Sequence, residues 1–338
     1  MKSLFQLRWL ILAMAIGGIV YGCKKDNSNT TSQNQSTVQT QADDHSMVSD
    51  ESDNIANDVT LALSSTPATN GNAAGHSLTQ GATTVLGTQS TPRAEGVGVI
   101  VNTQLICDAT VTIDTASDPR TITIVYNGTN CWGNRSRSGT VTLSIPANTH
   151  WEDAGATVTV LVQNVKITRI RDGKSFTLNG QRIITNVSGG SLINLAQLTS
   201  ITHTINDSLS ITFADNTSRV WQSAKQRVFT YNNGIVITTT GTHSDGTHTG
   251  ISDWGVNRFG TGFTAMITQP IVIRQDCSFR IVSGQHTIIR SDNLNSTITY
   301  GLDGSGNPTG CPASGGSYYF QIVWSFPNGK TLPLILPY

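Results

Sequence analysis

Groups that carry catalytic chemistry are scarce in this chain of 338 residues. Charged residues make up 12% of it and aromatic residues 7%, and Glu152 is the single glutamate after Glu95. The sequence has no Gly-x-Ser-x-Gly elbow, no Gly-x-x-x-x-Gly-Lys-Ser/Thr loop and no His-Glu-x-x-His motif. Hydrolases need an activated nucleophile or two carboxyl groups with separated pKa values. We therefore predict no catalytic residue and no cofactor.

The charge of the chain is balanced, with 21 basic and 21 acidic residues. Residues 24–96 hold three basic and eight acidic residues, a net charge of −5, whereas residues 97–338 hold sixteen and thirteen, a net charge of +3. Neither value indicates a surface that attracts a polyanionic duplex. No nucleic acid is expected among the partners.

One apolar run approaches the length of a membrane span, and it lies at the N-terminus. Residues 1–22 combine basic residues with the apolar run Trp9–Val20, which is typical of a cleaved secretory signal. The alternative is a transmembrane anchor, which needs roughly 20 apolar residues. The four residues Val20–Cys23 resemble a lipobox, although Tyr21 is bulkier than the small residue usual there. Cys23 is therefore predicted to carry a lipid that attaches the protein to a membrane.

Residues 23–96 are rich in Ser, Thr, Asn, Gln and Asp and poor in aromatic residues. Such a segment buries too little apolar surface to offset the entropy lost on ordering, so we expect a flexible tether. Within it, residues 46–63 place apolar side chains near helical spacing, with acidic residues close to the start. A short helix over residues 46–63 is the exception that this pattern predicts.

The remainder of the chain has the pattern of antiparallel β-strands. Runs of Val, Ile, Thr, Phe and Tyr alternate with hydroxyl residues, and Gly, Asn and Asp interrupt them every eight to twelve residues or so. The phase of the alternation shifts near Val165, which indicates a bulge or a second strand. We predict an all-β, sandwich-like fold of two consecutive related units, residues 97–199 and 200–338.

Four cysteines follow the predicted lipid attachment site, and an even number in an exported protein is usually paired. Cys107 precedes a strand that Cys131 follows, and Cys277 precedes a similar strand that Cys311 follows. This repeated order predicts two local disulfides, Cys107–Cys131 and Cys277–Cys311. The rival pairing is a long-range clasp that joins Cys107 to Cys311 and Cys131 to Cys277.

Several short motifs together resemble an uncharacterised family of Bacteroidota cell-envelope lipoproteins. The N-terminal half matches at Cys23-Lys24-Lys25-Asp26, Ile113-Asp114, Cys131, Gly133–Gly139, Gly155 and Asn186, and the C-terminal half matches at Arg274–Cys277, Ile281–Gly284 and Ile298–Gly301. Members usually have a more compact turn before the last cysteine than the one here. The resemblance implies an outer membrane lipoprotein, periplasmic or surface-exposed, and it implies no mechanism.

One segment has the composition of a glycan contact. Trp151 stands beside Glu152 and Asp153, and an aromatic ring next to two acids can stack on a sugar and hold its hydroxyl groups. Adjacent strand residues point to opposite faces, so these two carboxyl groups make a poor catalytic pair for a retaining glycosidase. The alternative is an ordinary solvated loop.

Two other groups were weighed as ligand sites. His243 and His248 flank Asp245-Gly246, and a two-residue hairpin loop there would place the two rings opposite each other as a weak metal candidate. A set of basic residues has the charge to receive an anionic polymer, the alternative being charges on solvent faces and edges. This set comprises Arg135, Arg137, Arg169, Arg171, Lys174 and Arg182.

The sequence favours a non-enzymatic, lipid-anchored β protein of the outer envelope that serves as a binding, adhesion or structural module. Its partner would be a glycan or an envelope protein. The alternative is a glycan-handling protein, either a carbohydrate-binding accessory lipoprotein or a glycoside hydrolase that uses Glu152. Binding to glycans separates the two hypotheses.

Overall fold

The structure is a computed structural model that describes residues 28–66, 69, 106–311 and 318–337. The chain divides into two units, Met1–Asp43 and Asp44–Tyr338. The described strands all lie in the second unit, together with the second half of a long helix. Cys23 and the signal sequence lie outside the described residues, and so do residues 70–96 of the predicted tether.

The described elements are one α-helix, fourteen strands and two short 3-10 helices. They are α2 (Ser28–Ser65), β1 (Ala109–Asp114), β2 (Arg120–Thr129), β3 (Arg135–Ile145), β4 (Ala156–Arg169), β5 (Ser175–Asn186), η2 (Leu192–Gln197), β6 (Ile201–Phe213), β7 (Ser218–Tyr231), β8 (Ile235–Gly241), β9 (Ile251–Val256), β10 (Gly262–Arg274), η3 (Gln275–Cys277), β11 (Arg280–Arg290), β12 (Asn295–Leu302), β13 (Tyr319–Ser325) and β14 (Thr331–Pro337).

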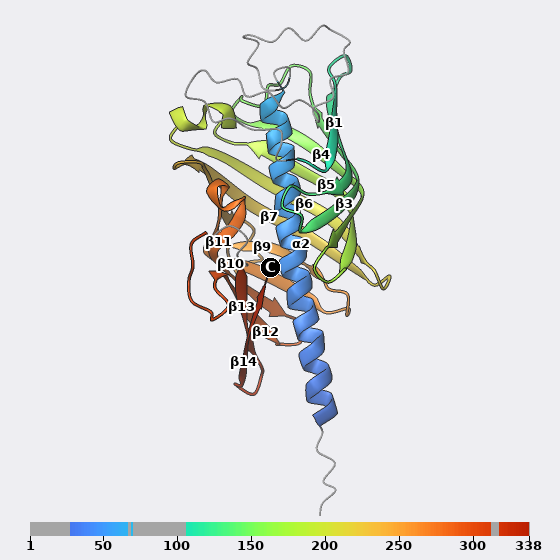
Figure 1. Cartoon of the computed structure of the whole chain (residues 1–338), viewed down its shortest axis with the longest axis vertical. Coiled ribbons are helices and arrows are strands. Elements are labelled where there is room, and N and C mark those ends of the chain that lie inside the picture. Colours follow the sequence, from blue (N-terminus) through green and yellow to red (C-terminus); the bar gives the residue numbers. More distant parts are fainter. Residues whose placement is uncertain (1–27, 67–68, 70–105, 312–317, 338) are drawn as a thin grey trace, which may run out of the picture. The chain divides into compact units, whose positions relative to one another are not determined.

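All the described strands belong to one antiparallel sheet whose order follows the chain, so the predicted antiparallel all-β fold is confirmed. The strand colours in Figure 1 accordingly pass from green to red along the sheet. β9 lies off this path and pairs with both β7 and β10. β5 pairs with β6 across the predicted unit boundary at residue 199, so the sheet is continuous between the two predicted units. The buried face of the sheet packs on a helix instead of on a second sheet.

Period-two alternation explains why the strands form and which face they bury. In β6, buried positions alternate with exposed or half-buried ones along the whole strand, and Ile201, Ile205 and Ile211 point to the buried face. We call this helix-facing side of the sheet the inner face. β4 keeps one continuous course, but its register shifts between Val162 and Val165 against β5 and between Gln163 and Lys166 against β3. The phase shift in the sequence therefore reflects a β-bulge.

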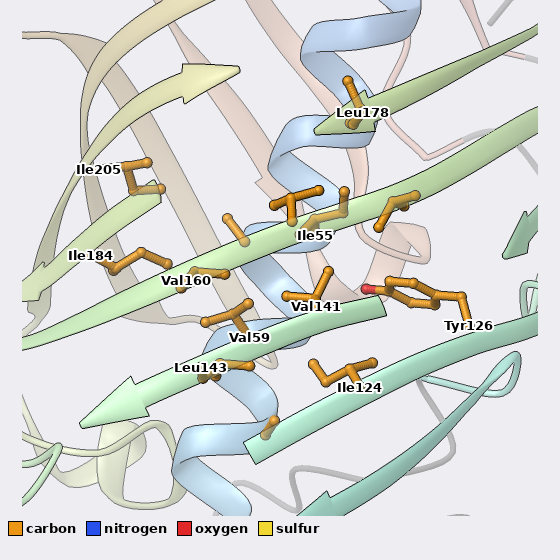
Figure 2. Packing of buried hydrophobic residues seen from close by; sticks show 14 of the residues in the cluster. Ile55, Val59, Ile124, Tyr126, Val141, Leu143, Val160, Leu178, Ile184 and Ile205 are labelled. Carbon is orange, nitrogen blue, oxygen red and sulfur yellow. The ribbon is translucent and has the colours of Figure 1, made fainter. Parts of the chain in front are cut away.

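The apolar core lies between the helix and the inner face of strands β1 to β7. Ile55 and Val59 of α2 are buried, and they point at Ile124, Val141 and Val160 of neighbouring strands (Figure 2). The other members of this contact surface shown in Figure 2 are Tyr126, Leu143, Leu178, Ile184 and Ile205. Burial of each such side chain contributes roughly 1.5–3 kcal/mol.

The predicted short helix over residues 46–63 is present as part of α2, and the helical residues from Asp44 to Ser65 belong to the compact unit. The physical reason is that this segment carries carboxylates whose basic partners lie on the inner face of the sheet. A polar composition predicts disorder when the neighbouring sequence has no groups that would bind the segment. Here the arginines that bind the helix carboxylates lie more than 80 residues away in sequence.

Both local disulfides are confirmed. The Cα atoms of Cys107 and Cys131 are 5.3 Å apart, and those of Cys277 and Cys311 are 5.1 Å apart, within the range that a disulfide spans. Each bridge fixes a turn at the end of a strand, at residues 130–134 in the first case and 275–279 in the second. Both turns contribute to the pocket considered below.

Candidate functional site

The structure buries Trp151, so its ring offers no face for the sugar contact predicted from sequence. It is 1% exposed, its ring packs on His203 with centroids 4.9 Å apart, and Asn186 Nδ2 donates to its carbonyl oxygen at 2.8 Å. Asp153 is exposed and accepts a hydrogen bond from the backbone of His150. Glu152 is half-buried. The Trp151, Glu152 and Asp153 segment is therefore a structural turn around a core tryptophan.

The two histidines of the weak metal candidate do not face each other. The backbone N–H of Asp245 donates to His248 at 3.3 Å, so the turn has Gly246 and Thr247 at its centre, one position later than predicted. His243 instead pairs with Ile251 and stacks on Trp254, with ring centroids 4.2 Å apart. His248 lies 3.1 Å from a carboxylate oxygen of Asp245.

Three of the basic residues considered for an external polymer face inward and hold α2. Arg135 Nε donates to Glu51 at 2.7 Å, and Arg137 Nη1 donates to Asp58 at 2.8 Å. Arg182 Nη1 donates to the carbonyl oxygen of Ser52 at 2.8 Å. The solvent-face interpretation is thus wrong for these three. Arg169 pairs with Asp172 in its own hairpin, while Arg171 and Lys174 are exposed.

Further ion pairs continue along the helix. Arg258 pairs with Asp44 at 2.7 Å, and Lys225 Nζ lies 3.4 Å from carboxylate oxygens of both Asp53 and Asp253. These basic residues of the inner face therefore bind the carboxylates of α2 and not an external anion. Removing one partner of such a buried pair leaves an uncompensated charge, which is costly, whereas the pair itself contributes little net stability.

A pocket lies between α2 and the sheet, over one stripe of the helix. The stripe contains Glu51, Asn54, Asp58 and Leu61, which are three or four residues apart and so share a face. The face with Ile55 and Val59 packs on the core. The remaining lining residues are Asn57, Thr60, Asn130, Trp132, Arg137, Leu192, Phe229, Ile235, Ile237 and Phe279.

Both disulfide-bearing turns supply an aromatic side chain to this pocket. Trp132 directly follows Cys131, and Phe279 comes two residues after Cys277. Ser278 and Phe279 have φ angles of +58° and +52°, a left-handed conformation that costs residues other than glycine. The backbone N–H of Phe279 donates to the carbonyl oxygen of Arg274 at 2.9 Å in this conformation, two residues after the disulfide-bonded Cys277.

The carboxyl groups of the pocket are engaged. Glu51 bonds to Arg135, and Asp58 accepts from Arg137 and from the Tyr126 hydroxyl at 2.8 Å. Burial raises the pKa of Glu51 and of Asp58, against the opposing effect of the adjacent arginines. Each carboxylate is fixed by an ion pair, so the two do not form a free acid–base pair.

The two amides on the helix are better placed to meet a ligand, because Asn130 already donates to Asn134 Oδ1 at 2.7 Å and accepts from the backbone N–H groups of Asn134 and Arg135. Asn54 and Asn57 from α2 and Asn130 from the β2–β3 turn line it beside Trp132 and Phe279. Asn57 is 8% exposed, and its Nδ2 has no hydrogen-bond partner within the described part of the chain. Convergent amides next to aromatic rings match the way pockets orient a polar organic ligand. Sequence reasoning missed these residues, because no local pattern shows that the helix packs beside the turns that carry Trp132 and Phe279.

Two clusters have metal-ligating side chains close together in the described residues. His45, Asp253 and His286 place one ligand atom each within 4.8 Å. Arg219, a pure donor, lies 3.1 Å from His45 Nδ1, so neutral His45 carries its proton on Nε2 and has no free lone pair. Lys225 next to Asp253 adds a second cation. In the other cluster, Cys277 and Cys311 are joined as a disulfide, which removes their thiolates.

No protein-family model, curated protein or solved structure matches this chain.

Proposed function

We propose that the protein is a lipid-anchored binding module of the outer envelope, of the Bacteroidota lipoprotein type that the sequence resembles. The signal sequence and Val20–Cys23 support the anchor, and the engaged carboxylates of the pocket support binding over catalysis. No helix in the described ranges combines the length and hydropathy of a membrane span.

The anchor makes a direct prediction. Changing Cys23→Ala removes the thiol to which the lipid attaches, so the variant should lose incorporation of labelled fatty acid and leave the membrane fraction. Cell fractionation and lipid labelling of wild type and variant measure this. Membrane retention of an unlabelled wild-type protein would contradict it.

The ligand that the pocket fits best is a saccharide. Trp132 and Phe279 offer apolar ring faces, Asn54 offers a side-chain amide, and Asn57 Nδ2 offers a donor for a hydroxyl group. The observation that carries this proposal is the convergence of these amides and rings from the helix and from two disulfide-fixed turns. The sequence also suggested glycan binding as an alternative function, but with Trp151 as the aromatic contact, whereas here the contact is Trp132.

Binding to a glycan array tests this function. Trp132→Ala should weaken the binding of any array ligand about tenfold, corresponding to roughly 1.4 kcal/mol of lost contact. Trp254→Ala is the matched control, because Trp254 is half-buried against His243 and does not line the pocket. Equal losses in both variants, or no array signal from the folded wild-type protein, would refute the saccharide site.

A further inference from the structure

Three polar side chains form a continuous row across the inner face of the sheet. His203 of β6 pairs in register with Arg227 of β7, and Arg227 pairs in register with Thr239 of β8. Each of the three is at most 2% exposed. Asn57 of α2 faces the row, since its Oδ1 accepts a hydrogen bond from Arg227 Nη2. We call these four residues the polar row.

The polar row has more donors than acceptors. Within the described residues, no hydrogen-bond partner exists for His203 Nε2, for Arg227 Nε and Nη1, for Asn57 Nδ2 or for Thr239 Oγ1. A buried polar group left unpaired costs about 1–3 kcal/mol. Four adjacent side chains with this deficit point to a bound group that supplies acceptor atoms.

The charge of the polar row also indicates a bound group with acceptor atoms. Arg135, Arg137 and Arg182 each form an ion pair with a carboxylate, but Arg227 has no carboxylate within ion-pair distance in the described ranges. Burial lowers its pKa to about 10, with Asp53 acting in the opposite direction. A buried guanidinium without a counter-ion is stabilised by an anion placed beside it.

The polar row adjoins the pocket. Phe229 pairs with Ile237, and both line the pocket two residues further along the strands that carry Arg227 and Thr239. Because side chains two apart share a face, this pair and the row are consecutive layers of one surface. Asn57 belongs to both, since it lines the pocket and bonds to Arg227.

We propose that the polar row is an anion subsite of the pocket and that the ligand is an acidic sugar, whose carboxylate Arg227, Asn57, His203 and Thr239 receive. The inference rests on the proposed saccharide function and narrows its ligand class. Trp132 and Phe279 contact the sugar ring, and the row selects for the negative charge. Uronic acids have this chemistry.

Titration calorimetry of the purified full chain with glucuronate, glucose and acetate, at one pH and ionic strength, tests the proposal. Wild type should bind glucuronate at least about tenfold more tightly than glucose, as expected for charge-assisted hydrogen bonds. Arg227→Met should bring the ratio near one. Arg219→Met, on the same strand and equally buried, should leave the ratio unchanged.

A second variant covers the case in which Arg227→Met fails to fold. Asn57→Asp is nearly isosteric and places a carboxylate beside Arg227, so it should stabilise the fold and abolish the preference for glucuronate. Equal affinity for glucose and glucuronate in wild type overturns the anion subsite and leaves the saccharide function intact. Acetate binding as tightly as glucuronate supports the subsite and refutes the saccharide function. Absence of binding by all three overturns both.

Discussion

Replacing Arg137 with alanine is expected to lower the free energy of unfolding by about 3–5 kcal/mol, as for other broken buried ion pairs. Arg137 donates to both oxygens of Asp108 at 2.6 Å and to Asp58 at 2.8 Å, and its guanidinium lies 4.2 Å from the ring centre of Tyr126. Its removal leaves two buried carboxylates without their cation. Urea unfolding of the purified variant measures the loss.

The matched control is Arg274→Ala, which removes an arginine paired with Asp276 in a comparably close, two-oxygen arrangement. Both of those side chains are about 40% exposed, so solvent screens the pair and its loss should cost under about 1 kcal/mol. Similar losses in the two variants would contradict the view that desolvated charges fix α2 to the sheet.

Lowering the pH from 6.5 to 4 should remove about 3 kcal/mol of stability through His286 alone. Burial lowers the pKa of His286 to about 4, with Asp253 raising it and Lys225 lowering it further. Between pH 6.5 and 4, His286 is therefore protonated in the unfolded chain and neutral in the folded chain. The contribution is fully present above the unfolded pKa of about 6.5 and is lost as pH falls through the folded value.

The measurement compares unfolding free energies of wild type and His286→Phe at pH 7, 6, 5 and 4. The difference between the proteins should change by up to about 1.4 kcal/mol per pH unit, in favour of the variant at acid pH. The single-site comparison is needed because burial raises the pKa of Glu51 and Asp58, so these groups stabilise the fold as pH falls. His150→Ala, at an exposed site, is the control, and parallel curves for wild type and His286→Phe would refute the prediction.

The strands and the disulfides were open to prediction because their signals are local. Alternation of period two is visible within six residues, and the repeated order of strand and cysteine selected Cys107–Cys131 and Cys277–Cys311 from the alternatives. The ion pairs had no such signal. Glu51 and Arg135 are 84 residues apart, and nothing in either neighbourhood indicates the other.

The candidate site was missed for a related reason. Composition singles out Trp151 because Glu152 and Asp153 follow it, whereas Gly133 and Asn134 follow Trp132. The inner packing on His203 buries Trp151, whereas the disulfide at Cys131 brings Trp132 to the pocket. Whether the turn with Trp132 or the turn with Trp151 lies at the pocket depends on how all the strands of the sheet pair, which no local sequence pattern shows.

The position of α2 ahead of all the described strands has a consequence for folding. Each strand pair along the meander closes a short loop, so the sheet can grow one hairpin at a time after synthesis. The helix is synthesised before the described strands, yet its cations arrive as late as Arg258, which is 214 residues after Asp44. Its carboxylates stay hydrated until then, and their dehydration is concentrated in a late docking step of high contact order. We therefore expect the docking of α2 to be slower than the closing of the hairpins between neighbouring strands.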